Sequence, residues 1–130
     1  MEIEKIFKNL ILADFVVIIL MVIASMYQPD EISNIYKDLN DGLLSNFENF
    51  SRIVSISLFF LYLFTLNLLY RFISYGKPLY LFVVIAGLVL NYFNGSVIYT
   101  AFSGMLDQIG GILSGAILIF LFYSPIRNNF

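Results

Sequence analysis

The stretch NLILADFVVIILMVIASMY, residues 9–27, decides the fold class. Its one charged residue is Asp14, and Gln28 and Pro29 follow it. About 20 apolar residues, each rising about 1.5 Å along a helix, cross a hydrocarbon layer about 30 Å thick. The stretch is too long and too uniformly apolar for a soluble strand. It therefore predicts a membrane-spanning helix.

The same pattern recurs three times, over residues 53–73, 78–101 and 106–123. Turn-forming residues separate these runs, and the links between the last three runs are short, which favours antiparallel neighbours. We expect an all-α polytopic membrane protein with four transmembrane helices in up-down-up-down order. These helices would form a single domain over residues 1–130.

The composition agrees with a chain surrounded by lipid. Its 130 residues are 60% apolar and 12% charged, whereas a soluble domain is about 25% charged. This excludes a disordered chain and a nucleic-acid binder. Abundant Asn, Ile, Phe and Tyr without Trp or Cys is compatible with an AT-rich bacterial source. The expected location is therefore the bacterial cytoplasmic (inner) membrane.

The positions of Lys and Arg predict the orientation, because these residues favour the cytoplasmic ends of spans. Most of them lie on the side of the two termini: Lys5, Lys8, Arg71, Lys77 and Arg127. The other side carries Lys37 and Arg52 among an excess of acidic residues. Both termini are therefore expected in the cytoplasm, with residues 28–52 forming an outer loop.

The outer loop has the pattern of a short amphipathic helix. Pro29 and Glu31 suit a first helical turn, and apolar residues from Ile32 onward recur at helical spacing. We expect this helix to lie on the outer membrane face or over the bundle. Because it is acidic rather than basic, contact with a partner protein is favoured over attraction to anionic lipid.

The N-terminal region allows a second interpretation, a cleaved signal peptide. Lys5 and Lys8 precede the apolar run, and cleavage after Ala24 would give a mature chain that begins near Ser25. Asp14 would then lie within the apolar core of the signal, and the run continues beyond the usual length of such a core. An uncleaved first span is therefore expected.

Asp14 is the side chain that most needs a partner, because a charge at the centre of a span costs about 2.5–3.5 kcal/mol on insertion scales. We expect it about 8 Å below the cytoplasmic end of the first span. The second span brings Asn67 to a similar depth, and Arg71 shares its helix face. The sequence predicts an Asp14–Asn67–Arg71 cluster, either a structural pairing or a proton or cation site. Tyr62 is interpreted as ordinary bundle lining.

Further polar and small residues fall in the last two spans. Asn91, Asn94 and Asp107 are candidates for a polar group toward the outside, although Asp107 also fits an acid that complements a helix N-terminus. Small residues let helices approach closely. They predict tight packing of the third span on the fourth, with self-association of the fourth span as the alternative. The residues that would form this contact are Gly87, Gly95, Gly111 and Gly115.

The function hypotheses follow from the chemistry that is missing. The chain has no His and no Cys, and it contains no Walker A, HExxH, GxGxxG or GxSxG motif. We therefore expect neither an enzyme nor a cofactor or metal site. The first hypothesis is a small integral membrane protein that acts by helix packing with partner membrane proteins, as an accessory, adaptor or immunity-type subunit. The alternative is a minimal oligomeric transporter or channel for a proton, an ion or a small solute.

Overall fold

The computed structural model describes residues 2–27, 29, 31, 34–35, 45–93 and 100–130. Four α-helices and one 3-10 helix cover most of these residues. They are α1 (Glu2–Met26), α3 (Ser45–Tyr70), α4 (Gly76–Phe93), α5 (Ala101–Tyr123) and the 3-10 helix η1 (Pro125–Asn129). The predicted all-α class is confirmed.

Three of the helices are long and apolar enough to cross a membrane. They are α1, the Arg52–Tyr70 part of α3, and α5. The apolar part of α4, Gly76–Tyr92, is shorter. These findings are consistent with a membrane protein.

The helix ends differ from the predicted spans. α1 and α3 begin well before residues 9 and 53, so residues 45–52 of the predicted outer loop are helical. α5 begins at Ala101 because the Thr100 side chain caps it, accepting a hydrogen bond from the Ser103 amide at 3.1 Å. The predicted turn before residue 106 is therefore helical. Most of the predicted amphipathic outer helix falls outside the described residues.

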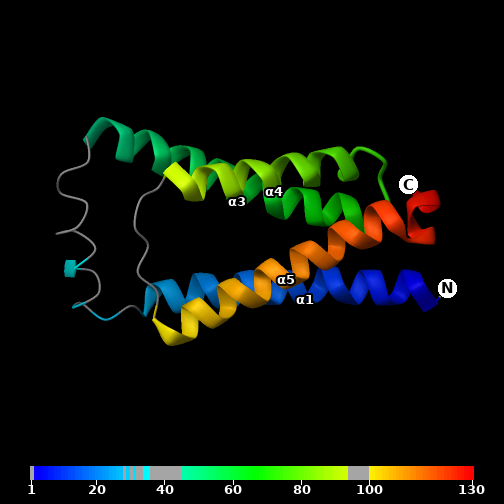
Figure 1. The fold of residues 1–130 in the computed structure, drawn as a ribbon, viewed down its shortest axis with the longest axis horizontal. Helices are drawn as coiled ribbons and strands as arrows, with labels where there is room; N and C mark the ends of the chain where they lie inside the picture. The colour runs from blue at the N-terminus through cyan, green and yellow to red at the C-terminus, as the bar shows by residue number, and fades with distance from the viewer. Residues whose placement is uncertain (1, 28, 30, 32–33, 36–44, 94–99) are drawn as a thin grey trace.

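The helices are arranged as two pairs (Figure 1). α1 packs along α5, and α3 packs along α4, whereas α4 and α5 touch at few positions. The predicted tight packing of the third span on the fourth is therefore wrong. Figure 1 also places both termini and the α3–α4 turn at one end of the molecule, which we call the terminal end.

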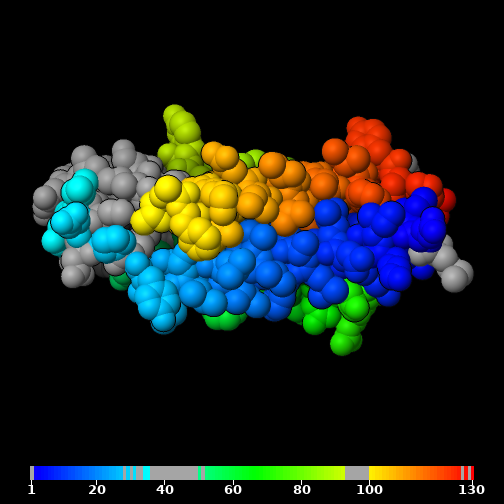
Figure 2. All heavy atoms as spheres, turned by 90° about the horizontal axis from the view of Figure 1, so that it is seen from below, coloured from blue at the N-terminus to red at the C-terminus, as the bar shows by residue number. Residues whose placement is uncertain are grey.

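The α1–α5 pair forms one continuous face of the molecule (Figure 2). Gly110 lies in this contact, since a Cβ atom built on it would meet Cγ1 of Val17 at 3.8 Å. The same construction at Gly111 meets nothing within 4 Å. Gly110 thus faces α1, whereas Gly111 faces no other helix of the described residues.

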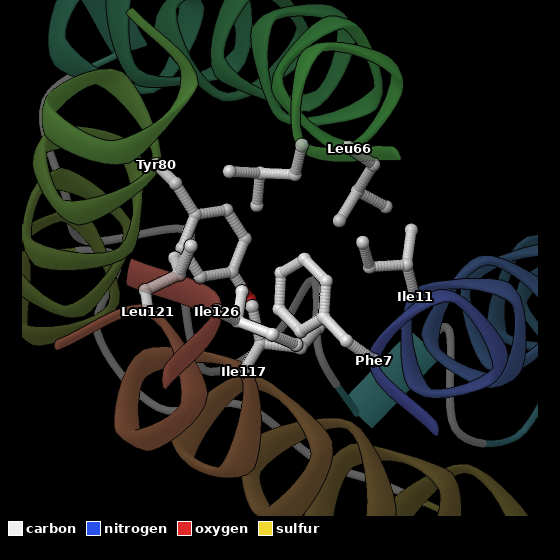
Figure 3. Packing of buried hydrophobic residues seen from close by; sticks show 8 residues of the cluster. Phe7, Ile11, Leu66, Tyr80, Ile117, Leu121 and Ile126 are labelled. Carbon is white, nitrogen blue, oxygen red and sulfur yellow. The ribbon is translucent and has the colours of Figure 1, made fainter. Parts of the chain in front are cut away.

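The apolar core lies toward the terminal end and draws on both pairs (Figure 3). Its buried members are Phe7, Ile11, Leu66, Leu69, Tyr80, Ile117, Leu121 and Ile126. η1 contributes Ile126, which is 1% exposed, so the segment after α5 folds back onto the bundle. Among the described residues, α1 beyond Val17 and α3 before Thr65 have no buried side chain. The two pairs are thus packed together most tightly at the terminal end.

Aromatic rings complete the packing at the terminal end. The Phe7 ring lies 6.0 Å from that of Phe72 and 6.2 Å from that of Phe130, and the Phe72 and Phe130 rings are 5.3 Å apart, all centroid to centroid. The Lys77 ammonium lies 4.7 Å from the Phe130 ring centroid, within range of a cation–π interaction. These rings join α1, the α3–α4 turn and the segment after α5.

The α3–α4 turn ends α3 without glycine. Phe72 takes the left-handed backbone conformation with φ 56°, its amide donates to the Leu69 carbonyl, and the Ile73 amide donates to the Leu68 carbonyl, both at 3.0 Å. This is the usual hydrogen-bond pattern of a Schellman cap. Gly76, the nearest glycine to this turn, lies beyond the cap and begins α4.

The start of α4 lies so close to the end of α3 that Gly76 leaves little room for a side chain. A Cβ atom there would lie 3.0 Å from Cδ2 of Leu69 and 3.2 Å from Cβ of Leu68. We expect Gly76→Ala to lower the free energy of unfolding in detergent by about 1–3 kcal/mol. Gly87→Ala is the control, since its Cβ atom would meet nothing within 4 Å. Equal losses in both variants would contradict the steric argument.

Candidate functional site

Asp14 lies at the midpoint of α1. Equal lengths of helix separate it from Glu2 and from Met26, about 18 Å in each direction. Its side chain is 1% exposed. α1 begins before residue 9, so the helix extends past the predicted span on the N-terminal side of Asp14. The depth of Asp14 below the cytoplasmic end of the span stays a prediction. The carboxyl group is therefore buried at the middle of α1, within the apolar run of residues 9–27.

The partner of Asp14 is Tyr62 on α3. The Tyr62 hydroxyl donates to Oδ2 of Asp14 at 2.6 Å, the short distance expected for a hydroxyl bound to a carboxylate. The same hydroxyl oxygen lies 3.2 Å from the Tyr80 hydroxyl of α4 and 3.0 Å from the Ser114 hydroxyl of α5. We call these four residues the Asp14 network. Each of the four α-helices contributes one member.

The direction of the hydrogen bonds follows from counting hydrogens. A tyrosine hydroxyl has one hydrogen to donate and two lone pairs that accept. Since Tyr62 donates its hydrogen to Asp14, Tyr80 and Ser114 must both donate to Tyr62. All three bonds then point toward the carboxylate, an arrangement in which each bond polarises the next.

Packing around the network keeps Tyr62 in place. The Tyr62 and Tyr80 ring centroids are 5.6 Å apart, and Tyr80 is fully buried. The Thr65 hydroxyl, also fully buried, donates to the Tyr62 carbonyl at 2.7 Å. The core residue Leu66 follows on the same face of α3. The hydroxyl that faces Asp14 is therefore held by its own helix and by α4.

The predicted Asp14–Asn67–Arg71 cluster does not form. Asn67 and Arg71 are both exposed. The face of α3 that points into the bundle carries Tyr62 and Leu66, and a helix advances about 100° per residue, so Asn67 and Arg71 fall on the outer face. In the described part of the chain, Asp14 is paired with no cation. Its carboxylate is surrounded by hydroxyl groups instead.

The other candidate residues lie away from the Asp14 network. Asn91 and Asp107 are exposed, and Asn94 and Gly95 fall outside the described residues. Gly87, Gly111 and Gly115 all have open space where a Cβ atom would lie. None of these three glycines forms the predicted close contact within the chain. Self-association through Gly111 and Gly115 stays a prediction.

Sequence reasoning missed Tyr62, Tyr80 and Ser114. The sequence marks Tyr62 only as bundle lining, and it gives no signal that singles out Tyr80 or Ser114. One signal could have found Tyr62: a carboxylate buried among apolar residues needs a donor. Tyr62 is also three and four residues from the inward positions Thr65 and Leu66, so it shares their helix face.

Comparisons with protein families, with curated proteins and with solved structures find no match to this chain. The described residues contain no group of three or more His, Cys, Asp or Glu side chains that could hold a metal ion. The case for a function therefore rests on the geometry of the Asp14 network.

Proposed function

We propose that this chain is a four-span integral membrane protein, with both termini in the cytoplasm, and that it works as a minimal proton-linked transporter. Asp14 is the group that takes up and releases the proton. The observation that supports this most is a carboxyl group, 1% exposed, within the apolar run of α1 and bound to a hydroxyl rather than a cation. Ionisable residues inside spans are rare and mark proton relays and ion pathways.

The surroundings of Asp14 suit a carboxyl group that changes its charge. A carboxylate is costly to bury, whereas a protonated carboxyl group is a neutral donor and acceptor. Hydroxyl groups can donate to the first form and accept from the second. A lysine or arginine would instead fix Asp14 in its charged form. The three hydroxyls of Tyr62, Tyr80 and Ser114 therefore leave both protonation states available.

The spacing of the oxygen atoms favours a proton over a metal cation. The oxygens of Asp14, Ser114 and Tyr80 lie 2.6, 3.0 and 3.2 Å from the Tyr62 oxygen, so they converge on a hydroxyl. A bound cation needs its oxygen ligands arranged around the ion itself. A proton needs no such space, because it is carried on an oxygen that already takes part in a hydrogen bond.

Proton flux into liposomes tests this proposal. The purified protein is reconstituted with a pH-sensitive dye inside, and a potassium diffusion potential drives proton entry. We expect the wild-type protein to acidify the interior faster than protein-free liposomes, and Asp14→Asn to fall to the protein-free rate. Asp107→Asn, which removes an exposed carboxylate on α5, is the matched control and should keep the wild-type rate. Equal flux in wild type and Asp14→Asn would reject Asp14 as the proton carrier.

A second candidate is the interaction protein, which acts by packing against a partner membrane protein or a second copy. The observation that favours it is the open space at Gly111 and Gly115, where no other part of the described chain approaches. Small residues of this kind allow close approach of helices in lipid. Purification from native membranes in mild detergent should then recover a partner or a homo-oligomer. Recovery of the monomeric chain alone would reject this second function.

A further inference from the structure

The Asp14 network lies between the two helix pairs. Asp14 and Ser114 belong to the α1–α5 pair, whereas Tyr62 and Tyr80 belong to the α3–α4 pair. The bonds from Tyr62 to Asp14 and to Ser114 therefore cross from one pair to the other, at 2.6 and 3.0 Å. The Tyr62–Tyr80 bond stays within a pair. The Tyr62 hydroxyl thus makes both of these bonds between the pairs.

Protonation of Asp14 changes these bonds. A hydrogen bond to a carboxylate is roughly twice as strong as one between neutral groups, so the Tyr62–Asp14 bond weakens when the carboxylate gains a proton. A protonated carboxyl group can also donate to Tyr62. The Tyr62 hydroxyl must then donate its hydrogen to either Ser114 or Tyr80. Whichever of the two accepts this hydrogen can no longer donate to Tyr62.

The titratable groups that face the Asp14 carboxylate are few. They are the phenols of Tyr62 from α3 and Tyr80 from α4, and α5 contributes the hydroxyl of Ser114. The hydrogen bonds found for the network among the described residues join only hydroxyl groups and the Asp14 carboxylate. Proton uptake at Asp14 is therefore the charge change that alters the Tyr62–Asp14 hydrogen bond between the pairs.

We infer that Tyr62 couples the proton on Asp14 to the relative position of the two helix pairs. This inference rests on the proposed function and adds to it the motion that the proton controls. The charged carboxylate holds the pairs together through Tyr62, and its protonation lets them separate at the end opposite the terminal end. The core around Phe7, Leu69 and Ile126 stays packed and acts as the pivot. Rocking of one rigid helix group against another is a common basis of alternating access.

The absence of cysteine from the sequence makes the motion measurable with spin labels. Met26→Cys on α1 and Ile53→Cys on α3 place one label on each pair near the end opposite the termini, at positions 78% and 64% exposed. Double electron–electron resonance in liposomes then gives the distance between the labels at acidic and alkaline pH. We expect a longer distance at acidic pH. A matched control places both labels on the α1–α5 pair, at Met26→Cys and Phe102→Cys, and its distance should not change.

Two variants test whether the pH response of the label distance depends on the Asp14 carboxyl group and on its bond to Tyr62. Asp14→Asn should give the long distance at both pH values, because it cannot become charged. Tyr62→Phe keeps the carboxyl group but removes the link, so it should also lose the pH response. A wild-type distance that ignores pH, or a Tyr62→Phe distance that still follows pH, would overturn the coupling. Neither result affects the liposome flux of wild type against Asp14→Asn, which decides the proposed function by itself.

A folding defect in these variants has its own check. The Met26–Phe102 control distance should be the same in wild type, Asp14→Asn and Tyr62→Phe if the α1–α5 pair is intact. Ser114→Ala removes the second bond that joins the pairs while keeping the Tyr62–Asp14 bond. Ser114→Ala should therefore retain the pH response of the wild type. If the response is lost, the coupling depends on Ser114, and the role of Tyr62 is overturned.

Discussion

Replacement of Phe7 by alanine is expected to lower the free energy of unfolding in detergent by about 2–4 kcal/mol. Phe7 is fully buried, and its ring contacts the rings of Phe72, Phe120 and Phe130. Between helices in lipid or detergent the gain comes from close packing rather than from removal of apolar surface from water. The loss therefore reflects the cavity that alanine leaves and the ring contacts that join α1 to the α3–α4 turn, to α5 and to Phe130 after η1.

The matched control for Phe7→Ala is Phe15→Ala. Phe15 lies on the same helix and is 40% exposed. We expect Phe15→Ala to change the free energy of unfolding by less than about 1 kcal/mol, because lipid or detergent fills the space. Titration with a denaturing detergent, followed by circular dichroism, measures both variants. Similar losses for the two substitutions would show that the terminal aromatic cluster is not the main stabilising contact.

The existence of the helices could be predicted from the sequence, but their ends could not. Long apolar runs allow no other regular structure in lipid, since every backbone amide must find a partner within its own segment. The ends depend on weaker signals. The polar residues Glu2 and Lys5 extend α1 because charged side chains are tolerated in a helix beyond the apolar run. The Thr100 cap likewise starts α5 before the apolar stretch begins.

The pairing of the helices lay beyond sequence reasoning for a different reason. Short links make the last three helices neighbours along the chain, and small residues were assigned to the contact between α4 and α5. In the structure α5 packs on α1, the helix most distant from it in sequence, with Gly110 facing Val17. The two neighbouring glycines, Gly110 and Gly111, differ by one helical step. Which of them faces another helix depends on the rotation of α5, and composition does not determine that rotation.

Of the Asp14 network, the sequence identifies Asp14 itself but not the residues that bind it. Asp14 is conspicuous because it is the one charge in its apolar run, whereas Tyr62 and Tyr80 are two of nine tyrosines. A tyrosine in a span is ordinary until the side on which its hydroxyl lies is known. Asn67 and Arg71 were chosen for their polarity and depth, yet they lie on the outer face of α3. The position of each residue around its helix axis, rather than its type, determines which polar groups are in contact.

Replacement of Asp14 by leucine is expected to raise the free energy of unfolding by about 1–2 kcal/mol while abolishing proton flux. Leucine has the same number of side-chain heavy atoms as aspartate. Replacement of a buried ion pair by apolar residues of similar volume is often neutral or stabilising by about 1–4 kcal/mol. Asp14 has no cation to offset the cost of burying its charge, so its removal is expected to act in the same direction. Tyr62 would keep Tyr80 and Ser114 as hydrogen-bond partners. A site kept for its function often costs stability, so both results together would indicate that Asp14 is retained for its chemistry.

A double-mutant cycle with Tyr62→Phe tests whether Asp14 is retained for its function or for stability. Alone, Tyr62→Phe leaves a buried carboxylate without its donor and should cost about 1–3 kcal/mol. In the Asp14→Leu background the same change should be nearly neutral, because no carboxylate remains to be satisfied. The coupling energy between the two positions should then exceed about 1 kcal/mol. If Asp14→Leu instead destabilises the protein as much as Tyr62→Phe does, the carboxyl group is required for the stability of the bundle and is not retained only for its chemistry. The loss of flux in Asp14→Asn would then reflect a loosened bundle rather than a missing proton carrier.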